Sequence, residues 1–303
     1  MEFVHKSVLF NESIEALNLN SSKIIADGTA GGGGHSRKIA KTAKRLIAID
    51  QDPDAIAVLG ERLGKMDNVT IVHNNFSNIK SIIKSLDIDN IDGLLLDLGV
   101  SSFQLDTADR GFSFHKDAPL DMRMSKSGLS AWDVVNTYSE EELANIIYKY
   151  GEEKFSRRIA ANIVKARADK PVETTFELVD IIKASMPQKA MRDSHPARRT
   201  FQAIRIEVNG ELDVLKKALD DILDCLNPGG RIAIITFHSL EDRIVKEKFN
   251  EWARGCTCPK EFPVCVCGNK PKGKVFKPQS PTNEELAENP RARSSRLRVF
   301  EKY

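Results

Sequence analysis

An apolar strand pattern that leads straight into a glycine-rich turn is the feature that most restricts how this chain can fold. Residues 23–27 read Lys-Ile-Ile-Ala-Asp, and they are followed by Gly-Thr-Ala-Gly-Gly-Gly-Gly, which ends at Gly34. Glycines in such a turn let the backbone approach a ligand closely, at the crevice where parallel sheets bind nucleotides. The combination predicts the first strand–turn–helix unit of an α/β nucleotide-binding fold.

The same alternation of apolar runs and amphipathic stretches continues along the chain, as expected for helices packed on a parallel sheet. Further strands are predicted at 45–49, 69–72, 91–97 and 229–237, and helices at 36–43 and 54–63. Residues 101–119 are rich in Gly, Ser, Asp and Phe and predict a functional loop, whereas the apolar spacing from about 131 to 204 is helical.

The pattern therefore predicts an α/β fold in which a helical domain interrupts a Rossmann-like domain with a mostly parallel twisted sheet. The expected boundaries are residues 1–104 and 206–303 for the Rossmann-like domain, and 105–205 for the inserted helical domain.

Composition excludes several protein classes but does not select a function. Hydrophobic residues make up 41% and charged residues 29%, which is typical of globular rather than disordered chains. No apolar run approaches the roughly 18 residues that a membrane span needs, and the first residues lack a secretory signal pattern. We therefore expect a cytoplasmic protein without a membrane segment.

Net charge is only +2, so the distribution of cations matters more than their number. Cationic residues cluster within 157–167, 192–205 and 291–298, and each cluster either contacts phosphates or forms a solvated face.

Two acidic positions beside the glycine turn indicate which cofactor it holds. Asp50 ends the second predicted strand, about 20 residues after the turn, where a carboxylate accepts hydrogen bonds from ribose hydroxyls. Asp27 directly precedes the glycines, where the pyrophosphate of a dinucleotide would lie. A carboxylate repels a pyrophosphate but attracts an ammonium or sulfonium ion. The pair favours S-adenosylmethionine, which carries both cations and no phosphate, over NAD.

Several long motifs resemble the bacterial small-subunit ribosomal RNA cytosine-N4 methyltransferase family (methyltransferase H). Besides the glycine turn, the matching blocks are Leu-Leu-Asp-Leu-Gly-Val-Ser-Ser at 95–102, Asp-Arg-Gly-Phe-Ser-Phe at 109–114, Pro-Leu-Asp-Met-Arg-Met at 119–124, the segment 195–205, Phe-His-Ser-Leu-Glu-Asp-Arg at 237–243 and Asn-Pro-Arg-Ala-Arg-Ser-Ser at 289–295. The resemblance covers essentially the whole chain.

The resemblance implies a class I methyltransferase domain interrupted by a helical substrate-recognition domain. It also implies S-adenosylmethionine contacts at Gly33, Gly34, His35, Asp50, Phe76, Asp97 and Gln104. Substrates in the family are a cytosine in the decoding region of small-subunit ribosomal RNA, within the assembled or nearly assembled subunit. A second copy of this chain, as a homodimer, is a further predicted partner, and no membrane partner is predicted.

Methylation of a cytosine amine requires a hydrogen-bond acceptor near the reacting nitrogen. The lone pair of this nitrogen is delocalised into the ring, so the enzyme has to align it with the methyl donor. Asp97, at the end of the fourth predicted strand, is the candidate, and the Leu98 carbonyl is a second acceptor. Other amino-methyltransferases carry two prolines and an aromatic residue after this position, which Leu98-Gly99-Val100 lacks, so Phe103, Phe112 or Phe114 is expected to stack on the base instead.

Three residues keep two interpretations each. His238 follows the fifth predicted strand and either contacts the substrate or holds the loop. His35 either donates to the cofactor carboxylate or stabilises a helix start. Phe76 packs against adenine or is an ordinary core aromatic.

The segment 189–205 combines arginines with an aromatic residue, a composition suited to phosphates and a splayed base. Arg198, Arg199 and Phe201 are the predicted RNA contacts, with internal salt bridges as the alternative. Arg205 is expected to be structural because it lies in the apolar run 203–208.

Four of the five cysteines lie close together in a segment that is rich in Gly, Pro and Lys. Cys256, Cys258, Cys265 and Cys267 could form a tetrahedral structural zinc site, although their spacing is not the usual one. Free or redox-active thiols are the alternative.

Two other functions remain open from the sequence: a noncatalytic RNA-binding assembly factor, and an NAD-dependent oxidoreductase, which Asp27 disfavours.

Overall fold

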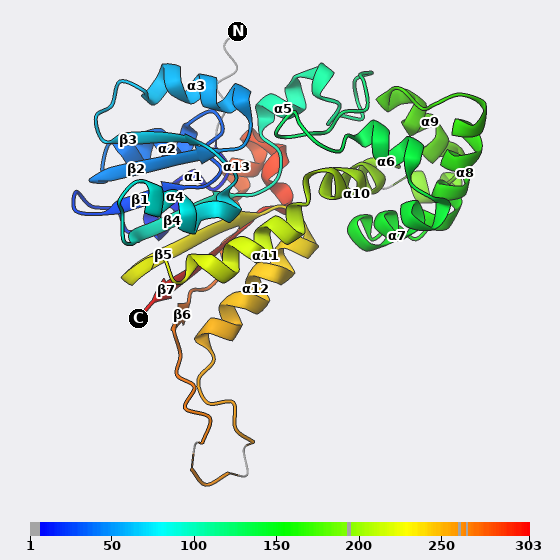
Figure 1. Cartoon of the computed structure of the whole chain (residues 1–303). Helices are drawn as coiled ribbons and strands as arrows, with labels where there is room; N and C mark the ends of the chain where they lie inside the picture. Colours follow the sequence, from blue (N-terminus) through cyan, green and yellow to red (C-terminus); the bar gives the residue numbers. More distant parts are fainter. Residues whose placement is uncertain (1–6, 193–194, 260–261, 265) are drawn as a thin grey trace. The chain divides into compact units, whose positions relative to one another are not determined.

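The computed structural model describes residues 7–192, 195–259, 262–264 and 266–303 (Figure 1). The chain divides into two compact units, one made of the segments up to Gly99 and from Leu212 onward, and one made of Val100–Glu211. The boundaries predicted at 104/105 and 205/206 fall inside helices α5 (Ser102–Asp106) and α10 (Arg198–Asn209). Both helices stay whole in the second unit, which shifts the boundaries outward.

The first unit contains a seven-stranded sheet with the order β3-β2-β1-β4-β5-β7-β6. The strands are β1 (Ile24–Asp27), β2 (Arg45–Asp50), β3 (Val69–His73), β4 (Ile91–Asp97), β5 (Leu226–Thr236), β6 (Gly273–Val275) and β7 (Arg296–Lys302). Strands β1 to β5 pair in parallel, while β7 runs antiparallel to both β5 and β6. The α/β class and the mostly parallel sheet are as expected from the sequence.

Helices cover both faces of this sheet because successive strand residues point to opposite sides. Ala26 and Leu94 belong to one core cluster, and their neighbours Ile25 and Leu95 to another. The first cluster is closed by α4 (Ile79–Ser85), α11 (Glu211–Ile222) and α12 (Ser239–Ala253), and the second by α1 (Phe10–Ala16), α2 (Gly34–Ala40) and α3 (Pro53–Leu63). A short helix, α13 (Asn283–Glu288), precedes β7.

Strand β7 was not predicted, because four of its seven residues are charged and they interrupt the apolar run. Arg298 is buried, and its Nε and Nη2 donate to the two carboxylate oxygens of Asp242 at 2.7 and 2.9 Å. Arg296 also reaches Asp242, at 3.3 Å. The cationic cluster at 291–298 is therefore partly a fold-holding ion-pair network rather than an open phosphate-binding face.

The second unit is helical, as predicted, and has its own apolar core. Its helices are α5, α6 (Ala131–Thr137), α7 (Glu140–Gly151), α8 (Ser156–Asp169), α9 (Thr175–Ala184) and α10. Ser130, Ser139 and Thr174 start α6, α7 and α9, and each accepts a hydrogen bond from the third backbone N–H of its helix. In the described part of the chain, none of the helices has the length and apolar character that crossing a membrane demands.

Candidate functional site

The strand order of the first unit reverses at β1, which lies between β2 and β4. In open α/β sheets, ligands bind outside the carboxyl ends of the strands at this switch point. The last residues of β1, β2 and β4 are Asp27, Asp50 and Asp97. The topology therefore brings three of the predicted site residues, and the glycine turn after β1, to one edge of the sheet.

The glycine turn contains three positions that a larger residue would not fit easily. A Cβ added to Gly28 would lie 2.5 Å from Leu96 Cδ2. Gly33 has φ +83°, in the left-handed region that favours glycine, and it precedes α2 as the N-cap. Gly34, which opens α2, would place a Cβ 2.1 Å from Ser7 Oγ. The turn thus keeps the backbone close to its neighbours at the carboxyl end of β1.

Asp27 is fully buried beneath this turn. Its carboxylate accepts hydrogen bonds from Ser36 Oγ at 2.6 Å and from the Thr29 backbone N–H at 3.3 Å. Burial raises the pKa of Asp27 to about 6, against the opposing effect of these two donors. The side chain is 1% exposed, so the carboxyl group holds a proton more readily than a solvated aspartate does.

Asp97, at the end of β4, is also perturbed by burial. Burial raises the pKa of Asp97 to about 8, and the nearby Asp27 and Glu241 carboxylates add to the effect. The side chain keeps 26% exposure, but Oδ1 is inaccessible to solvent and has no hydrogen-bond partner among the described residues. The backbone N–H of Asp97 donates to Thr29 Oγ1 at 2.6 Å, which ties β4 to the turn after β1.

No lysine or arginine in the described ranges forms an ion pair with Asp27 or Asp97. The nearest basic group to Asp97 is the His35 ring, with Nδ1 at 3.9 Å from Oδ2. A cationic ligand would supply the missing counter-charge at this edge, whereas a phosphate would be repelled.

Asp50 is held differently. Its Oδ2 accepts the Gly31 backbone N–H at 2.7 Å, and its Oδ1 accepts the Asp52 backbone N–H at 2.9 Å. Burial raises the pKa of Asp50, and these backbone donors oppose the rise. The carboxylate is therefore fixed in orientation, and each oxygen retains a lone pair that could accept a hydroxyl.

The two histidines occupy helix starts. His35 lies in the first turn of α2, is buried, and stacks on Phe10 with 5.5 Å between ring centroids. His238 is the N-cap of α12, and its Nδ1 accepts the Glu241 backbone N–H at 3.5 Å. Its Nε2 lies 3.2 Å from the Glu241 carboxylate. These contacts give His238 the loop-holding role, and its predicted catalytic role rests on the sequence alone.

Phe76 and Gln104 are engaged in local structure. Phe76 begins a short 3₁₀ helix after β3 and packs against the first core cluster. Gln104 belongs to α5 in the second unit, where its Oε1 accepts the Ser101 backbone N–H at 2.9 Å and completes a capping box. Both remain predicted cofactor contacts.

The predicted RNA contacts separate into exposed and buried residues on α10. Arg198 and Arg199 are exposed, and Arg199 Nη1 donates to the Glu152 carbonyl at 3.1 Å. Phe201 is 3% exposed and packs edge-on against Phe114 in the core of the second unit. Burial in the helical core favours a structural role for Phe201, and its contact with a base stays a prediction. Arg205 is structural, as expected, and pairs with Glu211 through two bonds of 2.8 and 2.9 Å.

Sequence reasoning missed the residues that tune the three aspartates. Thr29 was read only as part of the turn and Ser36 only as the start of the following helix, although both lie within ten residues of Asp27. Glu241 is 2% exposed and accepts the Phe237 and His238 backbone N–H groups at 2.8 and 3.3 Å. The pattern of a capping residue followed three positions later by Glu, here His238 and Glu241, is the signal that could have found it.

The predicted zinc ligands lie on the loop after α12. Cys256, Cys258 and Cys267 come together there, whereas Cys265 lies outside the described residues.

The sequence matches the model of the MraW methylase family over residues 2–303. A relative from Clostridium botulinum (strain Kyoto / Type A2), named Ribosomal RNA small subunit methyltransferase H, is 56% identical, and the match covers 100% of both chains. Ribosomal RNA small subunit methyltransferase H 2 from Agathobacter rectalis is 58% identical over 100% of this chain and 99% of its own. An rRNA methylase structure from Streptococcus thermophilus covers 98% of this chain and 97% of its own, at 13% identity and TM-score 0.45, a level that carries no argument about function. The family model and the full-length identities place this chain in the MraW methylase family.

Proposed function

We propose that this protein transfers a methyl group from S-adenosylmethionine to the exocyclic N4 amine of a cytosine in the decoding region of small-subunit ribosomal RNA. Full-length identity to relatives named as small-subunit ribosomal RNA methyltransferases supports the reaction and the substrate class. The observation that carries the cofactor assignment is the pair Asp27 and Asp97, two carboxyl groups with raised pKa values and no lysine or arginine partner among the described residues.

The residues at the carboxyl edge of the sheet fit this cofactor. Asp27 and Asp97 offer negative charge to its cations, and Asp50 offers carboxylate oxygens to the ribose hydroxyls. The glycine turn with Gly33 and Gly34 allows close approach, His35 lies beside it, and Phe76 offers an aromatic face. S-adenosylmethionine supplies an electrophilic methyl group on a sulfonium ion.

The protein's own contribution is to position the amine and accept its hydrogen bonds. Asp97 ends β4 with 26% of its side chain exposed, and the Leu98 backbone N–H donates to the Ile235 carbonyl at 3.0 Å. We assign Asp97 and the Leu98 carbonyl to the amine N–H groups, with no covalent bond between enzyme and base. Phe103 is 51% exposed and follows Asp97 by six residues, whereas Phe112 is buried, so Phe103 is our candidate for stacking on the target base.

Exposed cations of the helical unit are assigned to the RNA backbone. Arg198 and Arg199 are the first residues of α10, and Arg157 and Arg158 are exposed on α8. Helices α8 and α10 both pack against α7. Guanidinium groups pair well with phosphates. We further propose the assembled or nearly assembled small subunit as substrate and the cytoplasm as location. The predicted homodimer is tested by sedimentation of the purified chain.

The decisive experiment combines labelled S-adenosylmethionine with small subunits from cells that lack this protein. We expect label on one cytosine, located by nucleotide-resolved mass spectrometry, and none with the Asp97→Asn variant. Label on another nucleotide would overturn the substrate assignment. No transfer at all, with tight RNA binding, would favour the noncatalytic assembly factor, and binding of NADH in place of S-adenosylhomocysteine would favour the oxidoreductase.

The RNA-binding assignment is tested by an Arg198→Ala, Arg199→Ala double variant. We expect weaker subunit binding with a shallower salt dependence, and unchanged affinity for S-adenosylhomocysteine. Lys216→Ala with Lys217→Ala removes two exposed cations from α11 and serves as the matched control. Equal loss of RNA and cofactor affinity in the arginine variant would instead indicate a folding role.

A further inference from the structure

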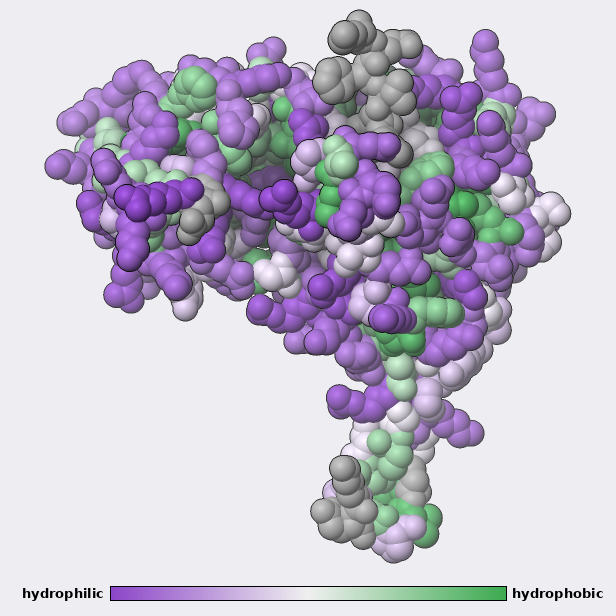
Figure 2. All heavy atoms as spheres, turned by 180° about the vertical axis from the view of Figure 1, so that it is seen from behind, coloured by the Kyte–Doolittle hydropathy of each residue, from purple (hydrophilic) through white to green (hydrophobic). Residues whose placement is uncertain are grey.

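The segment between α12 and β6, residues 254–272, forms an arm, and none of its described residues is buried (Figure 1). Hydrophobic side chains gather on its surface in Figure 2, and Phe262, Val264 and Val266 are 51%, 70% and 73% exposed. Hydrogen bonds of the arm near its base include Asn269 Nδ2 to the Gly255 carbonyl at 2.7 Å and Lys272 N–H to the Trp252 carbonyl at 2.8 Å. Because this arm buries so little apolar surface, something other than hydrophobic burial, such as a bound metal ion, has to order it.

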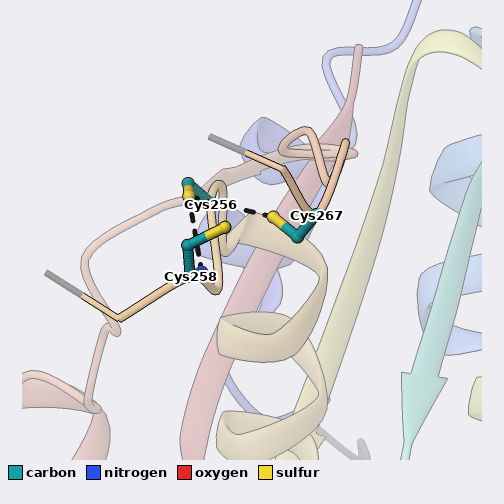
Figure 3. Close-up of side chains that lie close together, drawn as sticks. All are labelled: Cys256, Cys258 and Cys267. Atoms are coloured by element: carbon teal, nitrogen blue, oxygen red, sulfur yellow. Dashed lines mark hydrogen bonds between the residues drawn. The ribbon is translucent and has the colours of Figure 1, made fainter. Parts of the chain in front are cut away.

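Three cysteines converge within this arm (Figure 3). The Sγ atoms of Cys256, Cys258 and Cys267 all lie within 4.8 Å of one another, and those of Cys256 and Cys267 are 3.8 Å apart. In a tetrahedral site with Zn–S bonds of about 2.3 Å, neighbouring sulfurs are about 3.8 Å apart. A disulfide between Cys256 and Cys267 would instead require sulfurs about 2.05 Å apart.

The backbone around the cysteines supports the thiolate form that a metal requires. The Thr257 N–H donates to Cys267 Sγ at 3.3 Å, and the Cys258 N–H donates to Cys256 Sγ at 3.4 Å. The Val266 N–H donates to Cys258 Sγ at 3.3 Å. Each sulfur thus accepts one backbone donor, and such donors stabilise negative charge on metal-bound sulfur.

We propose that Cys256, Cys258 and Cys267 bind one zinc ion that orders this arm. Three soft sulfur ligands select zinc over hard cations such as Mg²⁺. The proposal assigns no fourth ligand, because Cys265, the remaining predicted cysteine, lies outside the described residues. The inference is independent of the methyl transfer proposed above.

The site is structural rather than catalytic, as its place in the first unit indicates. Helix α12 begins after the carboxyl end of β5 and has 15 residues, so it carries the chain back by about 22 Å. The arm then enters β6, whose Gly273 pairs with Lys302, next to the end of the β5–β7 ladder where Arg231 pairs with Glu301 and away from the carboxyl end of β5 at Thr236. The zinc site therefore lies toward the opposite end of the strands from Asp27 and Asp97.

The test measures zinc by mass spectrometry in the full-length protein, purified under reducing conditions. We expect about one zinc per chain in the wild type and in Cys225→Ala, whose buried thiol lies in the core and serves as the matched control. Cys256→Ser and Cys267→Ser should lose most of the metal and make the arm more sensitive to protease, while affinity for S-adenosylhomocysteine stays within twofold, about the error of the measurement.

A second measurement needs no variant. Wild-type protein reconstituted with Co²⁺ should show sulfur-to-metal charge-transfer absorption and the visible bands of a tetrahedral ion. The proposal is overturned if reduced, zinc-supplemented protein holds no metal, if the serine variants keep their zinc, or if Co²⁺ binds without the charge-transfer absorption. A disulfide among these cysteines in freshly purified protein that takes up no zinc after reduction would also overturn it.

Discussion

Two groups of carboxylates in the first unit share a partly buried setting but differ in their partners. Near β7, burial raises the pKa of Asp242, but hydrogen bonding and charge from Arg298 outweigh it and leave the pKa below its ordinary value. Glu301 is bonded to Lys274 and to Arg231, and these contacts likewise lower its pKa. At the carboxyl ends of β1 and β4, burial raises the pKa values of Asp27 and Asp97 to about 6 and about 8.

The difference shows which carboxylates hold the fold and which are prepared for a ligand. Ion pairs near β7 bind strands and helices of the chain to one another. The aspartates at the switch point lack lysine or arginine partners in the described part of the chain, a state that costs stability in the absence of a cation. Strongly perturbed acidic groups in a ligand-binding crevice are candidates for function. Substitutions in the two groups should therefore have opposite effects on activity and stability.

The largest expected effect is on catalysis in Asp97→Asn. The asparagine amide keeps the shape of the aspartate but loses its negative charge and one of its two oxygen acceptors. Methyl transfer to small subunits should therefore fall by about 100-fold or more. Stability should be equal to or above that of the wild type, since a buried acidic group is removed. Single-turnover kinetics measure the expected loss of methyl transfer, and urea unfolding measures the expected stability. Retained transfer with unchanged cofactor affinity would remove Asp97 from the mechanism.

The second prediction concerns the fold-holding group. Arg298→Met should lower the free energy of unfolding by about 2–3 kcal/mol, because Asp242 loses two charge-assisted hydrogen bonds. Urea unfolding measures the loss, with the exposed Lys216→Met as control. The affinity for S-adenosylhomocysteine should stay unchanged at temperatures where the variant is folded. If the variant had wild-type stability but bound S-adenosylhomocysteine poorly, Arg298 would belong to the ligand site and not to the group that holds the fold.

The sequence predicts the site better than it predicts its surroundings, for physical reasons. Strands β1, β2 and β4 contain continuous apolar runs because both faces of the sheet are covered, and the topology then puts Asp27, Asp50 and Asp97 at one edge. Strand β7 lacks such an apolar run, because its charged residues are paired with residues distant in sequence, a pairing that the local sequence does not indicate.

Phe201 shows the same limit on the helical side. An aromatic residue among arginines suggests a base-stacking surface, but Phe201, Ile204 and Val208 form a stripe on the core-facing side of α10. The spacing of apolar residues therefore indicates the position of Phe201 in the core better than the arginine-rich composition around it does. Which polar groups meet Asp27 and Asp97, by contrast, depends on tertiary packing: the capping pattern marks Glu241 as a helix-start residue, but no local pattern links Ser36 or Glu241 to these aspartates.

A third, smaller effect is expected in Asp50→Asn, an intermediate case between the two groups. Both Asp50 oxygens accept hydrogen bonds from backbone N–H groups, and the ribose hydroxyls require both oxygens as acceptors. The asparagine keeps only one of these two oxygen acceptors. We expect S-adenosylhomocysteine affinity to fall by about tenfold, the equivalent of roughly one charge-assisted hydrogen bond. Calorimetry measures it. Unchanged affinity would assign Asp50 to the turn alone.

The smallest effect is a pH dependence that separates the switch-point aspartates from the ion-paired ones. Because the pKa values of Asp27 and Asp97 are raised to about 6 and about 8, both groups are mostly protonated below pH 6 and ionise as pH rises toward 8. Their stabilising contribution is full below the ordinary aspartate pKa of about 4 and is lost as pH rises from there to the raised values, so the ligand-free protein should become less stable from about pH 4 to about pH 8.

A cationic cofactor reverses the preference, because it favours the ionised carboxylates. Binding of S-adenosylmethionine should therefore tighten several-fold from pH 6 to pH 8, below the limit of about tenfold per pH unit for one proton. S-adenosylhomocysteine, without the sulfonium charge, should show a weaker trend, and Asp97→Asn should flatten both. Calorimetry in buffers of different ionisation enthalpy would detect the released protons. A cofactor affinity that is constant with pH, or that weakens as these aspartates ionise, would mean that they do not face the cations.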